Sequence, residues 1–216
     1  MGGKLWEEVL NAQTFLGTSE KVYVRWLNVA ASNNDYVYTL ASIQYYDQGI
    51  LLKSTDGGNT WAKSNSSIDG KGVCLAVDPA DHQKLYLGSW YSGVFRSTDG
   101  GANWEAINNG LSTTSTDFRF IAIDPSNVQH IYTGVGRQVY HSLDSGDNWS
   151  PLGEAVTTDG KVSQVVIDPT DSDNIYATVY GEGVYKLTRE IPYLVVPENV
   201  SVTVEPADPD QTVRRV

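Results

Sequence analysis

A single cysteine, Cys74, occurs among the 216 residues, so the chain cannot form an intrachain disulfide. Basic residues are also few: 15 Lys and Arg stand against 26 Asp and Glu, which gives a formal net charge of −11. Nucleic acids and anionic membrane surfaces attract clustered Lys and Arg, so this balance argues against both as partners. No apolar run is long enough to cross a bilayer. We therefore expect no nucleic-acid partner and no membrane insertion.

Targeting, cofactor and metal signals are missing as well. The N-terminus has no charged-then-apolar signal sequence, so any signal peptide is absent or already removed; an extracytoplasmic or secreted location is slightly favoured. The sequence has no phosphate-binding loop, dinucleotide fingerprint or nucleophile elbow. His82, His130 and His141 show no metal-ligand spacing. We therefore expect neither a cofactor nor a metal.

The sequence does contain three copies of one motif, Ser-x-Asp-x-Gly-x-x-Trp, at residues 54–61, 97–104 and 142–149. Their aspartates lie 43 and 45 residues apart. A near-constant period of this length is typical of repeat architectures, in which each repeat is one supersecondary unit. The positions that define the motif are Asp56, Trp61, Asp99, Trp104, Asp144 and Trp149, and a half copy at residues 3–6 ends in Trp6.

The motif has the chemistry of a tight turn between two strands. Its glycines supply the positive φ angles that such a turn requires. An aspartate at the head of the turn accepts hydrogen bonds from backbone N–H groups further along it. A catalytic or metal-binding role for these carboxylates is disfavoured, because an active site needs one constellation rather than three equivalent ones. We therefore interpret the aspartates and tryptophans as structural.

Short runs of alternating apolar, β-branched and aromatic residues surround each motif and end at Asn, Asp or Gly, which are strand signals. Asp-Pro follows the first run of three units, at Asp78, Asp124 and Asp168, because proline removes a ladder donor and forces a turn. The sequence therefore predicts an all-β fold of four similar units within residues 1–190. Residues 191–216 are Pro-rich, with one alternating run, and are predicted to be a linker, an interaction arm or the start of another domain.

The motif resembles the Asp-box, or BNR repeat, of sialidases, xyloglucanase-type glycoside hydrolases, sortilin-type receptors and the photosystem II assembly-factor family. This resemblance implies a β-propeller in which each box joins the third and fourth strands of a blade. It implies about four four-stranded blades here. Because these families do unrelated things, the resemblance favours a fold rather than an activity.

The two ends of the repeat array are complementary. The chain opens halfway through a box, whereas the fourth unit stops at Leu187 without one. Closure of the ring by pairing residues 5–9 with residues 183–187 would remove exposed strand edges. Two chains that exchange these strands would instead form an eight-bladed homo-oligomer. A third interpretation is that both ends belong to a longer array.

Aromatic and charged residues are predicted on the loops of the face opposite the boxes. Exposed aromatics on loops over a rigid scaffold are common in sugar and protein recognition. The alternative is that they only cover apolar loop residues, and the sequence leaves both open. The candidate ligand-binding residues are Tyr45, Tyr46, Asp47, Trp90, Tyr91, Arg137, Tyr180 and Glu182.

We therefore predict a non-enzymatic binding or scaffolding module with a protein or glycan ligand. The alternatives are a glycoside hydrolase or a fragment of one, and a photosystem II assembly-factor-like protein. A sialidase would need an arginine cluster, but only Arg25 and Arg119 lie near the starts of inner strands. A xyloglucanase would need paired carboxylates, and no spacing selects a pair among Asp47, Asp117, Asp159 and Glu182.

Overall fold

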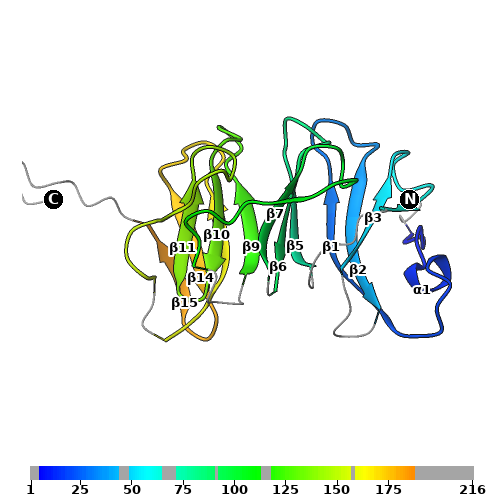
Figure 1. Ribbon diagram of the computed structural model, residues 1–216, viewed down its shortest axis with the longest axis horizontal. Coiled ribbons are helices and arrows are strands. Elements are labelled where there is room, and N and C mark those ends of the chain that lie inside the picture. The colour runs from blue at the N-terminus through cyan, green and yellow to red at the C-terminus, as the bar shows by residue number, and fades with distance from the viewer. Residues whose placement is uncertain are drawn as a thin grey trace, which may run out of the picture.

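The computed structural model describes residues 5–43, 49–64, 72–90, 92–112, 118–156 and 159–187. Within these ranges the chain forms one short α-helix and fifteen β-strands, arranged as four antiparallel sheets (Figure 1). The all-β class and the four repeated units predicted from the sequence are confirmed. The tail, residues 191–216, lies outside the described residues.

The sheets, called sheets 1 to 4, follow one another along the chain. Helix α1 (Ala12–Phe15) precedes sheet 1, which contains β1 (Val22–Val29), β2 (Val37–Ile43), β3 (Ile50–Ser54) and β4 (Ala62–Lys63). Sheet 2 contains β5 (Gly72–Val77), β6 (Leu85–Ser89), β7 (Gly93–Ser97) and β8 (Glu105–Ala106). Sheet 3 contains β9 (Phe118–Ile123), β10 (Ile131–Val135), β11 (Gln138–Ser142) and β12 (Ser150–Pro151). Sheet 4 contains β13 (Val162–Ile167), β14 (Ile175–Val179) and β15 (Gly183–Lys186).

Asp-Pro turns join the first and second strands of sheets 2, 3 and 4. The side chains of Asp78, Asp124 and Asp168 each accept a hydrogen bond from the N–H two residues further on, at 2.8, 2.8 and 2.9 Å. This Asx geometry satisfies a backbone donor that the turn would otherwise leave unpaired. The first strand of each of these sheets therefore ends at a turn that is stabilised by its own aspartate.

Neighbouring sheets meet through their innermost strands: β1 contacts β5, β5 contacts β9, and β9 contacts β13. The apolar faces pack between consecutive sheets, and each interface forms its own core cluster. Between sheets 1 and 2, for example, Tyr38, Leu40 and Leu51 pack against Leu85 and Leu87. The array runs from α1 and sheet 1 at one end to sheet 4 at the other (Figure 1).

Ring closure within one chain is not observed among the described residues. Residues 5–11 form no strand, and Leu5 and Trp6 are fully exposed. The reason is that the N-terminal segment packs on sheet 1: Leu10, Ala12 and Leu16 cover its outer face. Sheet 4 lies at the opposite end of the array, separated from this segment by sheets 2 and 3 (Figure 1). The four sheets therefore form an open array.

Candidate functional site

The three boxes form the turns β3–β4, β7–β8 and β11–β12, which are third-to-fourth strand connections. In each, a buried serine hydroxyl at the end of the third strand organises the turn. The hydroxyls of Ser54, Ser97 and Ser142 accept from a glycine N–H four residues further on, at 2.9, 2.9 and 2.8 Å. Each also donates to the box aspartate, at 2.8, 2.8 and 2.7 Å.

Both carboxylate oxygens of each box aspartate are used within the same turn. In the first box, Oδ1 of Asp56 accepts from the Thr60 N–H at 2.8 Å and Oδ2 from the Thr60 hydroxyl at 2.6 Å. In the other two, Asn103 and Asn148 donate to Asp99 and Asp144 in the same way, through their N–H and their side-chain amide. Both oxygens of each aspartate are therefore engaged in holding the turn.

The same hydrogen bonds explain the acidity of these groups. Those from the side chains of Asn148 and Ser142 lower the pKa of Asp144 to about 2. The Thr60 hydroxyl and N–H lower the pKa of Asp56. For Asp99, partial burial acts to raise the pKa, but hydrogen bonds from Asn103 and Ser97 lower it overall. Carboxylates with a lowered pKa stay ionised and stabilise the turn, and they are poor proton donors near neutral pH.

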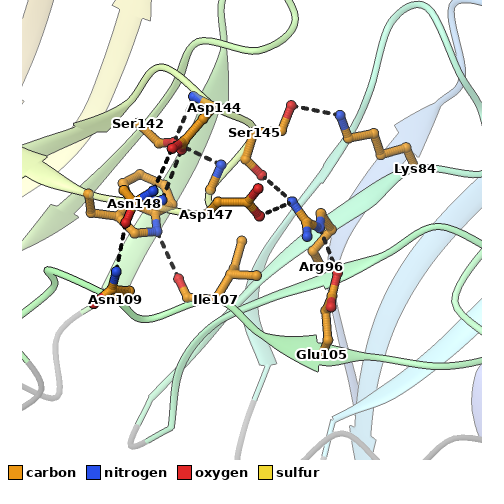
Figure 2. Close-up of polar contacts among 12 residues, drawn as sticks. Lys84, Arg96, Glu105, Ile107, Asn109, Ser142, Asp144, Ser145, Asp147 and Asn148 are labelled. Atoms are coloured by element: carbon orange, nitrogen blue, oxygen red, sulfur yellow. Dashed lines mark hydrogen bonds and ion pairs between the residues drawn. The ribbon is translucent and has the colours of Figure 1, made fainter.

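The boxes also connect neighbouring sheets (Figure 2). Arg96 of β7 extends Nη1 to Oδ1 of Asp147 at 2.8 Å and to the carbonyl of Ser145 at 3.0 Å, both in the box of sheet 3. Its Nε lies 2.7 Å from Glu105 Oε1. From the opposite side of the box, the indole N–H of Trp149 donates to the Ile107 carbonyl at 2.8 Å. The box of one sheet is thus fastened to the sheet before it.

The predicted ligand-binding residues that the structure describes lie on equivalent turns of different sheets. Trp90 belongs to the β6–β7 turn, Arg137 to β10–β11, and Tyr180 and Glu182 to β14–β15. These turns share one end of the array, opposite the boxes. Tyr180 is 77% exposed, and Glu182 accepts a hydrogen bond from Tyr185 at 2.7 Å. Tyr45, Tyr46, Asp47 and Tyr91 lie outside the described residues.

Backbone hydrogen bonds hold the loop-face turns of sheets 3 and 4. The N–H of Val162 donates to the carbonyl of Gly136, and that of Tyr180 to the carbonyl of Lys161, each at 2.9 Å. Each bond joins the connection between two sheets to a second-to-third strand turn. Side chains on these turns are therefore carried by a fixed scaffold rather than by free loops.

A groove along the innermost strands was not predicted from the sequence. It has a volume of about 420 Å³ and receives residues from β1, β5, β9 and β13. Its walls are mostly aliphatic, but Trp26, Asn28 and Gln164 add an aromatic ring and two amides. The available signal was that the amides of Asn28 and Gln164 lie within runs of mostly apolar residues.

Of the groups expected of a hydrolase, two acidic residues lie near each other: a methyl group added at Gly160, the residue after Asp159, would lie 2.5 Å from Glu182 Oε1. Arg25 is exposed and lies over the ring of Tyr23, 5.7 Å from its centroid. Asp159 and Glu182 are exposed on the loop face, and Asp117 lies outside the described ranges. In the part of the chain that is described, no cluster of His, Cys, Asp or Glu could hold a metal ion. No helix there is long and apolar enough to span a membrane.

The sequence profile of the Sortilin-Vps10 family, described as sortilin, neurotensin receptor 3, matches residues 49–187, which include all three boxes. The chain belongs to the Sortilin-Vps10 family. This membership agrees with the Asp-box resemblance of the sequence.

The chain is also similar in sequence to xyloglucanases. The chain is 30% identical over 151 residues to the xyloglucanase Xgh74A of Acetivibrio thermocellus, a match that covers 54% of this chain and 18% of that enzyme. A xyloglucanase of Hypocrea jecorina is 29% identical over 141 residues, covering 61% and 15%. The chain therefore spans less than a fifth of the length of these relatives.

Solved structures show the same relationship. The GH74 enzyme of Niastella koreensis is 30% identical, with a TM-score of 0.60, and the match covers 76% of this chain and 28% of that one. YCF48 of Cyanidioschyzon merolae has a TM-score of 0.50 at 14% identity, covers 80% and 69%, and supports the fold alone. These are propeller-type proteins, so the open array of this Sortilin-Vps10 chain has the architecture of a propeller arc.

Proposed function

We propose that this chain is a non-enzymatic glycan-binding part of a β-propeller, and that its loop face recognises a β-glucan of the xyloglucan type. The observation that carries the proposal is the placement of Trp90, Arg137 and Tyr180 on equivalent turns of consecutive sheets, of which the turns of Arg137 and Tyr180 are anchored by backbone hydrogen bonds. Exposed aromatics on a rigid face suit the flat, apolar faces of sugar rings, and a guanidinium suits their hydroxyls. The xyloglucanase relatives supply the substrate class.

Recognition rather than hydrolysis is favoured by the carboxylates of the described loop face. Glycoside hydrolysis generally needs two carboxyl groups about 5–9.5 Å apart across the scissile bond. Asp159 and Glu182 are the described acidic candidates for such a pair, and Glu182 lies beside Gly160, the residue after Asp159. Glu182 is already engaged by the Tyr185 hydroxyl, which restricts its reach. This chain alone therefore has the features of a binding surface more than those of a catalytic cleft.

A second candidate is that the chain contributes one part of a xyloglucan hydrolase. The 30% identity to Xgh74A over 151 residues favours this alternative. Because the match covers 18% of that enzyme, the catalytic pair would require residues beyond the matched region. Protein recognition is a third candidate. It is favoured by membership of the Sortilin-Vps10 family, which is described as neurotensin receptor 3, and by the fold-level likeness to YCF48.

Calorimetry of the purified chain with xyloglucan oligosaccharides tests the proposal, with an α-glucan as the negative control. Binding is expected, and Tyr180→Ala should weaken it by about tenfold, because truncating an exposed aromatic anchor costs about 1 kcal/mol or more. The matched control is Leu143→Ala, a similarly exposed residue on the box face, which should bind like the parent.

Two results would contradict this function. Release of new reducing ends from xyloglucan by the pure chain would establish the hydrolase alternative. Absence of binding to every β-glucan, with capture of a protein instead, would establish the protein-recognition alternative.

A further inference from the structure

The four sheets repeat one face that is buried in three of them and exposed in the fourth. Its second-strand position is a tyrosine in every sheet: Tyr38, Tyr86 and Tyr132 are buried against the following sheet, whereas Tyr176 is 37% exposed. The third-strand position is apolar in every sheet. Leu51, Val94 and Val139 are buried there, whereas Val184 is 72% exposed. Sheet 4 therefore exposes a surface whose equivalents in sheets 1, 2 and 3 are covered by the following sheet.

A cation is repeated on this face in sheets 1, 2 and 4, whereas sheet 3 has His141 at the same position. Lys53, Arg96 and Lys186 pair across the strands with Tyr38, Tyr86 and Tyr176 respectively. Lys53 lies over the Tyr38 ring, 5.5 Å from its centroid, and Lys186 lies over the Tyr176 ring at 5.4 Å. In sheets 1 and 2 this cation faces the box of the next sheet, as Arg96 does with Asp147. The Lys186–Tyr176 pair has the same construction and an exposed face in front of it.

The opposite face of sheet 1 shows the reciprocal feature. Leu27 of β1 is 65% exposed, whereas Leu75 and Val165, at the same position of the innermost strand, are buried against the preceding sheet. Val29 is also more than half exposed, while its counterpart Ile167 is buried. The first sheet thus lacks the apolar cover that the inner strands of later sheets receive.

The N-terminal segment lies where the outer strand of a preceding sheet would lie. Val9 and Ile107 both stand three residues after a tryptophan. A methyl group added at Gly146, in the box of sheet 3, would lie 2.4 Å from Ile107 of the sheet before it. One added at the matching Gly58 would lie 4.0 Å from Val9. Residues 5–11 therefore take the place of a fourth strand, and sheet 4 has three strands among the described residues.

We propose that a second copy of this chain covers both surfaces, in a head-to-tail dimer that closes a ring of eight sheets. The face of sheet 4 with Tyr176, Val184 and Lys186 packs on sheet 1 of the partner, against the partner's Leu27 and its first box. Residues 5–9 of each chain lie along β15 of the other, which pairs the exposed strand edge. One chain carries both halves of the interface, so a twofold arrangement satisfies every surface at once.

Charge complementarity between Lys186 and the first box favours this head-to-tail orientation. Lys186 would face the carboxylate turn at Asp56 of the partner, as Lys53 faces the box of sheet 2 within one chain. The Asp56 carboxyl, whose pKa is lowered by hydrogen bonds from Thr60, is anionic near neutral pH. The proposal does not rest on glycan recognition, because neither surface includes the loop-face residues.

Sedimentation equilibrium of the purified chain tests the proposal. The parent should have twice the mass of one 23.7 kDa chain. Val184→Asp on one surface and Leu27→Asp on the other should each give a folded monomer, because both residues are exposed within one chain and buried only in the dimer. Leu143→Asp, at an exposed residue outside both surfaces, should remain dimeric.

Circular dichroism and thermal melting of each variant check that loss of the dimer is not loss of the fold. A mixture of the two monomeric variants should form heterodimers through its one intact interface, more weakly than the parent. A parent chain that is monomeric at all concentrations would overturn the proposal, as would a dimer that survives both substitutions. Dissociation by Leu143→Asp alone would place the interface elsewhere and overturn it equally.

Discussion

Gly101 lies directly against Leu51: a methyl group added at Gly101 would sit 2.1 Å from Leu51 Cδ2. The first residue belongs to the box of sheet 2 and the second to the third strand of sheet 1. The turn that the sequence encodes locally is therefore also the surface on which the preceding sheet packs. The absence of a side chain at this glycine sets how closely two sheets approach.

This contact predicts that the same substitution has different costs at matching positions of two boxes. Gly58 and Gly101 have similar φ angles, 94° and 87°, so alanine strains both backbones by about 1–2 kcal/mol. Only at Gly101 does the new methyl collide with the neighbouring sheet, which adds about 1–3 kcal/mol of overpacking. Gly101→Ala should therefore lower the free energy of unfolding clearly more than Gly58→Ala, as measured by urea denaturation.

The comparison needs a background in which no second chain meets Gly58. Both substitutions are therefore made in the Val184→Asp variant, whose mass is first confirmed to be that of a monomer. Equal losses of stability at the two positions would contradict the close approach of sheets 1 and 2.

Arg96 provides a second prediction about the contact between sheets. Arg96→Met keeps most of the aliphatic volume but removes the hydrogen bonds to Glu105, Asp147 and the Ser145 carbonyl. Leaving the Ser145 carbonyl without this donor and losing the charged contacts should lower the free energy of unfolding by about 1–3 kcal/mol. Thermal or urea unfolding of the monomeric background measures it.

The matched control is Lys186→Met, at the same position of sheet 4. Its ammonium is exposed and stacks on Tyr176, so its loss should cost less than about 1 kcal/mol in a monomer. If the two substitutions cost the same, Arg96 does not fasten the box of sheet 3 to sheet 2.

The turns of this fold could be predicted because they depend on contacts between residues that are close in the sequence. In each box, the hydrogen bonds join residues that are at most four positions apart in the sequence, as in the box of Ser97 and Asp99. The spacing of the motif was therefore enough to predict the turns. Each Asp-Pro turn is equally local. The all-β class and the order of the units follow from these turns and from the alternating strands between them.

Ring closure could not be predicted, because it depends on how strongly the array curves. That curvature is set by side chains packed between sheets, such as Leu51 on Gly101, which are distant in sequence. The half box at Trp6 predicted an outer strand at residues 5–9, but these residues form no strand within the described chain. Likewise, the groove was missed because Trp26, Asn28 and Gln164 meet only when the inner strands are placed side by side.

The last prediction concerns acid stability. Hydrogen bonds from Asn148 and Ser142 hold the pKa of Asp144 at about 2, below its ordinary 3.8. A folded-state pKa lower than that of the unfolded chain means that the unfolded chain binds protons first as the pH falls. The stabilisation is therefore fully present above about pH 4 and is lost as the pH decreases toward about 2, by about 1 kcal/mol for this partly exposed group after solvent screening.

Asp144→Asn tests this sign directly. The variant should be less stable than the parent near neutral pH, because its amide N–H group meets the donors of Asn148 and Ser142. Its deficit should shrink as the pH falls toward about 2, where the parent loses its carboxylate too. Glu20→Gln, at an exposed carboxylate outside the boxes, should follow the parent curve throughout. The free energy of unfolding is measured by urea denaturation at each pH. A difference between parent and Asp144→Asn that stays constant over this pH range would show that ionisation of the box aspartate does not stabilise the fold.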